Sequence, residues 1–396
     1  NLAVDSIGTL YMAGQNGSNN SFRVMRFDGI NWMQIGTELA GTSEAPSLAL
    51  DSYGTPYVVS IDSYGRAGVM KFDGNDWIQI GSTGFTSGRI YSTSLAIDND
   101  GTPYVAFANG RPRLTVSVMK FDGNEWVQVG STEFISDKAF RPSLAIDGDG
   151  VPYVAYIDYA YGERLSVMKF DGIDWVQVGN PGFTDGFVIV YPRLAIADNG
   201  MPYVAYPDRA NDDRLSVMKF DGIEWVQVGA AGFTSNTKHF GFALDSNNVP
   251  YVTYTDGADE YHGASVMQFD GNQWQQVGTP GFTPGMADFP YLAIDSTNNL
   301  YVAYSDGVND GRASVMKFDS STAPPPPQEG DWQQVGSAGF SADSTSFNRI
   351  EVDSKGTPYV TYSDDAHLER ASVMLIYCTD RKQVGSGGFT PGMAFF

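Results

Sequence analysis

The chain has 396 residues, enough for roughly two or three ordinary domains or for one repeat domain. Its 42% hydrophobic and 13% aromatic residues suffice for a sizeable core and exclude general disorder, and no apolar run is long enough to cross a bilayer. The 46 acidic and 24 basic residues give a net charge of −22, which argues against nucleic acid and anionic membranes as partners because phosphate binding needs basic patches.

A repeat organises the chain from its first residues to its last. The stretch from Leu144 to Gly179 and the stretch from Leu194 to Gly229 agree at most positions. Between 46 and 58 residues separate the starts of successive units, and self-similarity at this period is typical of repeat folds. The first apolar residues of the eight units are Leu2, Leu48, Leu95, Leu144, Leu194, Phe242, Leu292 and Ile350.

Four short β-like runs follow one another in each unit. They have the form LAID, PYVAY, SVMKF and WVQVG, and Gly, Pro, Asp or Asn bound each run. The Asp–Gly pairs between the first and second runs, and between the third and fourth, are typical of tight hairpin turns. Each unit is therefore predicted to be a four-stranded antiparallel sheet.

Four strands per unit at this period predict an all-β protein, with residues 1–396 forming a single eight-bladed β-propeller. A blade alone leaves both faces exposed, so neighbouring blades must cover each other. We expect the recurrent tryptophan of the fourth run to pack between neighbouring blades. These tryptophans are Trp32, Trp77, Trp126, Trp175, Trp225, Trp274 and Trp332.

The first two runs resemble a known repeat. The stretches LAIDNDGTPYVAF and LAVDSIGTLYMAG are similar to NHL-type and YVTN-type propeller repeats, in which the run like LAVD is the innermost strand. The stretch SVMKFDGNEW resembles the hairpins of fungal and bacterial propeller lectins. A second frame stays open, in which PYVAY is innermost and the N-terminal LAVD completes the last blade as its outer strand.

With LAID innermost, the loops after the second and fourth runs share one face, and that face carries nearly all of the sequence variation. We expect binding there. An Asp and an Arg recur in the loop between the second and third runs, either as a surface ion pair or turn cap at the hairpin mouth or as a repeated polar pocket. The pairs are Asp62 with Arg66, Asp158 with Arg164, Asp208 with Arg214, Asp306 with Arg312, and Asp364 with Arg370.

The sequence predicts no catalytic residue, metal site or cofactor. His239, His262 and His367 lie in different loops, and no metal-ligand or nucleophile motif is present. The acidic first turns of each unit, such as DNDG, are better interpreted as hairpin turns than as calcium loops, which need a longer acidic run. An acidic pair hidden in one loop stays an alternative.

The seventh unit carries an insertion at residues 320–330. Its four prolines, Pro324, Pro325, Pro326 and Pro327, favour a polyproline II segment, which is either a tolerated insertion or a spur for a partner or glycans. This stretch resembles hydroxyproline-rich glycoproteins of algae and plants. Asn16 and Asn19, in the first variable loop, match the N-glycosylation pattern.

The eighth unit loses its tryptophan, and Arg381 stands in its place. In the outer hairpin, Leu375 stands where most other units have Lys, Tyr377 where they have the turn Asp, and Cys378 where they have the turn Gly. An apolar outer edge is typical of an interface, and drift in a terminal repeat is the alternative. Cys378, the one cysteine, has no internal partner and would be available for a bond to another chain outside the cell.

These features lead first to a non-catalytic extracellular or cell-surface scaffold or adhesion module, a protomer of a filament or assembly with protein partners. The alternatives are a multivalent lectin that binds glycans through the variable face, and a polysaccharide hydrolase or lyase with an acidic loop site. The C-terminal GFTPGMAFF followed by the N-terminal NLAVD nearly reproduces the internal GFTPGMADFPYLAID, so we expect Phe396 to lie close to Asn1.

Overall fold

A computed structural model gives the structure of the chain. It describes residues 2–4, 10–16, 21–27, 32–40, 47–62, 64–86, 88–110, 114–131, 134–135, 138–189, 191–235, 237, 239–257, 262–295, 298–319, 331–334, 338, 345–352, 358–364, 370–376 and 381–383. The chain divides into two compact units, one of Leu39–Phe233 and one of Asn1–Glu38 with Thr234–Phe396.

The unit of Leu39–Phe233 is built from strands, with two short 3₁₀ turns. They are β5 (Leu39–Ala40), β6 (Leu48–Leu50), β7 (Pro56–Ile61), β8 (Ala67–Phe72), β9 (Trp77–Gln79), β10 (Ile90–Ile97), β11 (Pro103–Asn109), β12 (Val116–Phe121), β13 (Trp126–Gln128), β14 (Ala139–Ile146), β15 (Pro152–Asp158), η1 (Tyr159–Tyr161), β16 (Arg164–Phe170), β17 (Trp175–Gln177), β18 (Arg193–Ile196), β19 (Pro202–Asp208), η2 (Arg209–Asn211), β20 (Arg214–Phe220) and β21 (Trp225–Gln227).

The other unit has the same kind of elements. They are β1 (Leu2–Val4), β2 (Leu10–Asn16), β3 (Ser21–Phe27), β4 (Trp32–Gln34), β22 (Phe240–Leu244), β23 (Pro250–Thr255), β24 (Ala264–Phe269), β25 (Trp274–Gln276), β26 (Ala287–Ile294), β27 (Leu300–Asp306), η3 (Gly307–Asn309), β28 (Arg312–Asp319), β29 (Asp331–Gln334), β30 (Thr345–Val352), β31 (Pro358–Asp364), β32 (Arg370–Ile376) and β33 (Arg381–Gln383). No helix among the described residues is long and apolar enough to cross a membrane.

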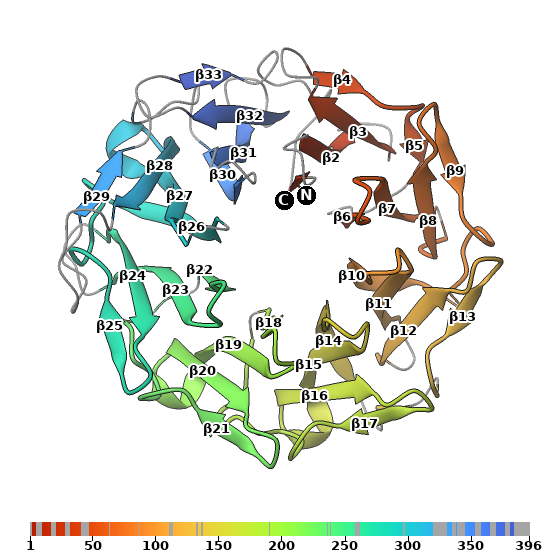
Figure 1. Ribbon diagram of the computed structural model, residues 1–396, viewed down its shortest axis with the longest axis horizontal. Coiled ribbons are helices and arrows are strands. Elements are labelled where there is room, and N and C mark those ends of the chain that lie inside the picture. The colour runs from red at the N-terminus through yellow and green to blue at the C-terminus, as the bar shows by residue number, and fades with distance from the viewer. Residues whose placement is uncertain are drawn as a thin grey trace. The chain divides into compact units, whose positions relative to one another are not determined.

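Each repeat forms a meander of four antiparallel strands in chain order. The sheet β14-β15-β16-β17 shows the pattern: Leu144 pairs with Val154, Val154 with Met168, and Met168 with Gln177. The same order recurs in the other repeats, and the labelled strands can be followed in Figure 1. The prediction of an all-β protein made of repeated four-stranded antiparallel sheets is confirmed.

The strand frame is the one with LAID first. Strand β1 pairs antiparallel with β2 of its own repeat, so the frame in which the N-terminal strand completes the last sheet is wrong. First strands of successive sheets contact each other, as β10 does with β6 and β14. In the other unit β26 contacts β30, and β30 contacts β1. The first and last sheets of the sequence are thus neighbours within one unit, whereas Asn1 and Phe396 lie outside the described residues.

Four of the seven tryptophans are described in contact with the preceding sheet, as predicted. The indole N–H of Trp225 in β21 donates to the carbonyl of Val178, which follows β17 of the preceding sheet, at 2.6 Å. Phe183 from the connection between these sheets stacks on the indole, with 4.2 Å between ring centroids. Trp126, Trp175 and Trp332 make the same N–H bond to the sheet before them. The indole N–H of each of these buried rings therefore has a hydrogen-bond acceptor.

Candidate functional site

Buried aspartates fix the loops between the second and third strands. Asp158 is 3% exposed, and its carboxylate accepts hydrogen bonds from the Ala160 N–H at 3.0 Å and from the Ser166 hydroxyl at 2.8 Å. The first bond caps the 3₁₀ turn η1. The Ser166 oxygen also accepts the Gly182 N–H at 2.9 Å, so one network ties the loop to the connection that leaves the sheet. Asp208 with Ser216, and Asp306 with Ser314, repeat the carboxylate–hydroxyl bond.

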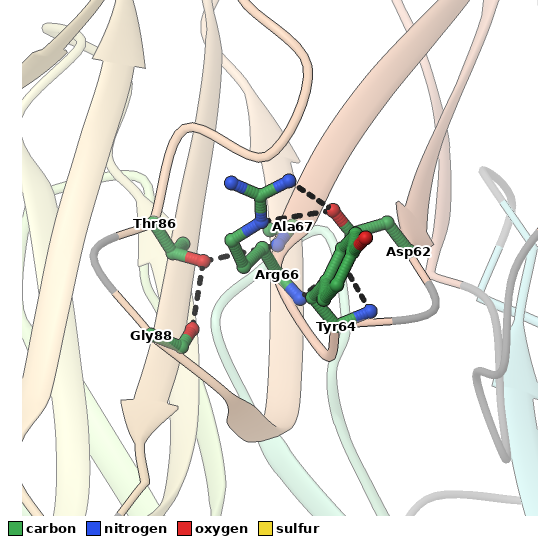
Figure 2. A network of polar contacts seen from close by, with 6 residues as sticks. All are labelled: Asp62, Tyr64, Arg66, Ala67, Thr86 and Gly88. Carbon is green, nitrogen blue, oxygen red and sulfur yellow. Dashed lines mark hydrogen bonds and ion pairs between the residues drawn. The ribbon is translucent and has the colours of Figure 1, made fainter.

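In three of the described connections a threonine anchors the chain to the edge of the third strand. Figure 2 shows Thr86, whose hydroxyl oxygen accepts the Ala67 N–H at 3.0 Å while its O–H donates to the Gly88 carbonyl at 3.1 Å. Thr184 and Thr283 make the equivalent pair of bonds. This face is consequently a set of loops on rigid anchors, which is the arrangement that positions variable binding residues.

The Asp62–Arg66 pair is a closed local structure. The Asp62 carboxylate accepts bonds from the Arg66 Nε at 2.9 Å and Nη2 at 2.8 Å, and from the backbone N–H groups of Tyr64 and Arg66 (Figure 2). Burial raises the pKa of Asp62, but the bonds from Arg66 and Tyr64 outweigh it and hold the pKa below 3.8. The Arg66 guanidinium carbon lies 5.2 Å from the Tyr64 ring centroid.

The other predicted Asp–Arg pairs are strand partners at the hairpin mouth. Asp158 and Arg164, Asp208 and Arg214, Asp306 and Arg312, and Asp364 and Arg370 stand opposite each other in register. The first three aspartates direct their carboxylates to serines, and the side chains of Asp364 and Arg370 lie outside the described residues. The repeated polar pocket therefore stays a prediction.

A β-bulge marks the start of several first strands on the same face. The register shifts between Phe140 and Ser143 in β14 and between Asp288 and Tyr291 in β26. Arg141 and Phe289 occupy these bulges with φ of 54° and 49°, in the left-handed region that disfavours such side chains. A bulge re-aims the side chain that it carries, and a strained backbone of this kind is most common at functional sites.

The bulge of β14 places a cation over an aromatic ring. The Arg141 guanidinium carbon lies 4.6 Å from the centroid of the Tyr191 ring, and Nη1 donates to the Ile189 carbonyl at 2.5 Å. Val188 is 1% exposed and its N–H donates to the Glu163 carbonyl at 2.8 Å, so it fixes this segment to the sheet. The side chains of Phe187 and Ile189, on either side of the buried Val188, are exposed, and 48% of the Tyr191 side chain is exposed as well.

A second cation lies over an aromatic ring of the same segment. The Arg209 guanidinium carbon is 5.7 Å from the Phe187 ring centroid, and Arg209 pairs with Asp213. Phe187 is 42% exposed. We call Arg141, Phe187, Ile189, Tyr191 and Arg209 the Arg141 platform. Its members come from β14, from the connection before β18 and from η2.

The other unit carries a histidine at the equivalent position. The Nδ1 of His239 lies 3.6 Å from the Asp288 carboxylate, and the imidazole stacks on Phe289 with 4.1 Å between centroids. The side chains of His239 and Asp288 are 41% and 39% exposed. An imidazole that is open to solvent and has a carboxylate close to one nitrogen is a candidate proton-transfer group.

Neither arrangement was predicted from the sequence. A signal was present, because Arg141, Tyr191, His239 and Phe289 each stand three residues before the first apolar residue of a repeat. The position changes residue type from unit to unit while its surroundings repeat. Such variation indicates that the fold does not require a particular side chain at this position. Only the bulges and the contacts in the structure show which of these side chains meet.

The remaining predicted sites lie mainly outside the described residues. These are Tyr377, Cys378, Asn19 and the prolines Pro324, Pro325, Pro326 and Pro327. Asn16, expected in a loop, is the last residue of β2 and pairs with Ser21. Arg381 pairs with Ile376 as the tryptophans pair with phenylalanines elsewhere, and Leu375 pairs with Lys382. The interface at this hairpin stays a prediction. Among the described residues no group of three or more His, Cys, Asp or Glu could hold a metal ion.

No protein-family model matches the chain, NHL-type and YVTN-type repeats included, and no curated protein matches it. Solved structures do. An ulvan lyase of polysaccharide lyase family 25 is similar with a TM-score of 0.51 and 12% identity, covering 86% of this chain and 92% of its own. The BP39L lectin of Burkholderia pseudomallei is similar with a TM-score of 0.53 and 14% identity, covering 82% of this chain and 94% of its own.

The same lyase has been solved bound to -[GlcA(1-4)Rha3S]-, and that structure is similar with a TM-score of 0.51 and 12% identity over 85% of this chain and 92% of its own. At such identities the likeness establishes the fold, which is that of the propeller lectins and lyases. The resemblance to propeller lectins is confirmed at this level.

The comparisons contradict two predictions. The chain was expected to be a non-catalytic scaffold and not an enzyme, but the solved proteins of similar fold are a polysaccharide lyase and a lectin. The expectation rested on missing sequence motifs. On this fold a site draws single residues from loops of different sheets, as the Arg141 platform does, so no local motif has to be present.

Proposed function

We propose that this protein binds carbohydrate chains through the Arg141 platform. The observation that carries the proposal is the row of exposed aromatic side chains backed by arginines, Phe187 under Arg209 and Tyr191 under Arg141. Sugar rings have apolar C–H faces that pack on aromatic rings, and hydroxyls at their edges that need hydrogen-bond partners. The platform offers both, on a segment that Val188 holds in place.

The arrangement of the repeats supports this proposal. We infer that the eight repeats close into one propeller ring, and the contact of β30 with β1 inside one unit supports closure. Polysaccharides of the kind bound by lectins and lyases are extracellular polymers, which favours an extracellular location for the protein. Glycans are then its partners.

A binding screen tests the function. The unaltered protein is applied to an array of polysaccharide fragments, and the best chain is titrated by calorimetry. Replacing Phe187 and Tyr191 with Ala should weaken binding at least tenfold, because truncating a central aromatic contact costs about 1–2 kcal/mol. Ile223→Ala is the matched control, since Ile223 is 86% exposed in a turn between the third and fourth strands of its sheet. No binding to any chain would refute the proposal.

A second candidate function is polysaccharide lyase activity at His239, favoured by the Asp288–His239 geometry. In an elimination at a 4-linked uronate the imidazole would take the C5 proton, and the C5–H electron pair would form the C4=C5 double bond as the C4–O bond breaks. The leaving oxygen would gain a proton from water, and the imidazolium would return its proton to the hydroxide that forms. The Asp288 carboxylate would orient the ring and stabilise the imidazolium.

Ultraviolet absorbance measures this activity, because the new double bond is conjugated with the uronate carboxylate. His239→Asn and Asp288→Asn should lower the rate by at least a hundredfold and about tenfold, respectively. His262→Asn is the control, since His262 contributes its backbone carbonyl to Ala287 and lies on a different loop. A uronate panel without any absorbance change excludes the lyase while leaving carbohydrate binding in place.

A further inference from the structure

The structure assigns an anionic carbohydrate, one that carries carboxylate or sulfate groups, to the Arg141 platform. This inference rests on the proposed carbohydrate binding and adds the chemical class of the ligand. The chain has a net charge of −22, yet two arginines lie over the aromatic rings of the platform. A general attraction for anions is excluded by that charge, so anion binding needs a built local site.

The Arg141 guanidinium is placed where it can bind an anion. Its guanidinium lies over the Tyr191 ring, and the described contacts use one N–H, which donates to the Ile189 carbonyl. A guanidinium has several further N–H donors in a planar fork that matches the two oxygens of a carboxylate or sulfate group. The Tyr191 ring covers one flat side of the group and leaves its edges to a ligand.

The two arginines differ in how far their charge is balanced within the protein, and this difference indicates which of them binds the anionic group. Arg209 already pairs with Asp213, whose side chain is 14% exposed, so part of its charge is balanced within the protein. Among the described residues, the hydrogen-bond partner of the Arg141 guanidinium is the neutral Ile189 carbonyl and not a carboxylate. Arg141 is consequently the anion-binding residue, and Arg209 with Phe187 extends the platform for the neighbouring sugar.

The backbone supports a dedicated role for Arg141. It adopts φ 54° in the bulge and precedes Pro142, and in the corresponding bulge of β26 Phe289 precedes Pro290 with φ 49°. A non-glycine residue in this region costs about 1–2 kcal/mol. Arg66 provides the comparison within the same unit, because its guanidinium donates two bonds to Asp62 and is occupied by the protein itself.

The experiment compares one acidic polysaccharide with its carboxyl-reduced and its desulfated forms, using calorimetry with the full chain. We expect the acidic chain to bind at least tenfold more tightly than the form that lacks the recognised group. The form that loses affinity identifies the group as carboxylate or sulfate. Arg141→Gln should remove this preference and keep the residual affinity for the neutral form, and Arg141→Lys should restore part of it because a lysine retains the charge but not the fork.

Arg164→Gln is the matched control, since Arg164 is an exposed arginine of the same unit and its loss changes the net charge equally. The preference of the Arg164→Gln variant for the acidic chain should equal that of the unaltered protein. Equal binding of acidic and neutral chains overturns the anionic class and leaves the proposed function intact. A preference that survives in Arg141→Gln overturns the role of Arg141, and absence of binding to every chain overturns both the inference and the proposed function.

Discussion

At the scale of single residues, aspartate serves the loops of this protein in two ways. Asp62 holds an arginine, whereas Asp158 holds a serine hydroxyl and the N-terminus of a 3₁₀ turn. The difference follows from the third strand. Ser166 stands opposite Tyr156 and donates its hydroxyl to Asp158. At the equivalent position, opposite Ser60, Gly68 has no hydroxyl, and Asp62 accepts bonds from the Arg66 side chain four residues later instead. Neither aspartate is left without hydrogen bonds.

Replacing Arg66 with Met should lower the free energy of unfolding at neutral pH by at most about 1 kcal/mol, because the pair is partly exposed and salt screens it. The pKa of Asp62 lies below 3.8 in the folded protein, so its contribution is present above pH 3.8 and is lost as the pH falls through the folded-state pKa. The variant should therefore lose less stability on acidification than the unaltered protein.

Urea unfolding at neutral pH and at a series of values below pH 3.8 measures both quantities. Arg164→Met serves as the control, because Arg164 is exposed and its predicted partner Asp158 is bonded to Ser166. The backbone bonds from Tyr64 and Arg66 remain in the Arg66 variant, so part of the acid dependence should persist. An unchanged acid dependence would show that the guanidinium contributes nothing to the Asp62 carboxylate.

At the scale of elements, the contact between neighbouring sheets depends on a glycine after each fourth strand. Gly179 has φ 66°, and a Cβ there would lie 2.8 Å from Cδ1 of Trp225 and 2.9 Å from the Phe220 ring. Gly130 and Gly81 meet the indoles of Trp175 and Trp126 in the same way. The recurrent glycine of WVQVG thus has two causes, a left-handed backbone and the close approach of the next sheet.

Gly179→Ala should destabilise the unit of Leu39–Phe233 by about 2–4 kcal/mol, of which about 1–2 kcal/mol is backbone strain and the rest is the displaced indole. Gly172→Ala isolates the first part, since Gly172 has φ 99° and nothing lies within 4 Å of its Cβ position. Chemical unfolding followed by tryptophan fluorescence measures the difference. Equal losses in the two variants would mean that the close contact with Trp225 adds no cost.

At the scale of the whole molecule, the sequence predicts the sheets far better than the sites. Alternation and Asp–Gly turns are local, so the strands, their order and the tryptophan contacts follow from the repeat. The Arg141–Tyr191 contact joins two repeats through a bulge, and neither the bulge nor the left-handed Arg141 has a sequence signature beyond the following Pro142. Sites of this kind depend on how side chains of neighbouring repeats meet, and the residues that repeat from unit to unit carry no information on these contacts.

A buried tyrosine is the second residue of the second strand in both units, and this gives a property of the whole molecule. Burial, with Asp98 as the next cause, raises the pKa of Tyr104 from 10.0 to about 12, and burial together with Asp245 does the same for Tyr251. The folded-state pKa exceeds the unfolded one, so the stabilising contribution is complete below pH 10 and disappears as the pH rises toward about 12.

Both units should therefore lose stability between pH 10 and about pH 12, and tyrosinate absorbance should rise together with the change in tryptophan fluorescence. Tyr104→Phe cannot ionise at this position and should retain more of its stability in that window, relative to its own value at neutral pH. If the absorbance of these tyrosines rose near pH 10 while the fluorescence stayed native, the buried phenols would be ionising inside the folded sheets, and alkaline loss of stability would need another cause.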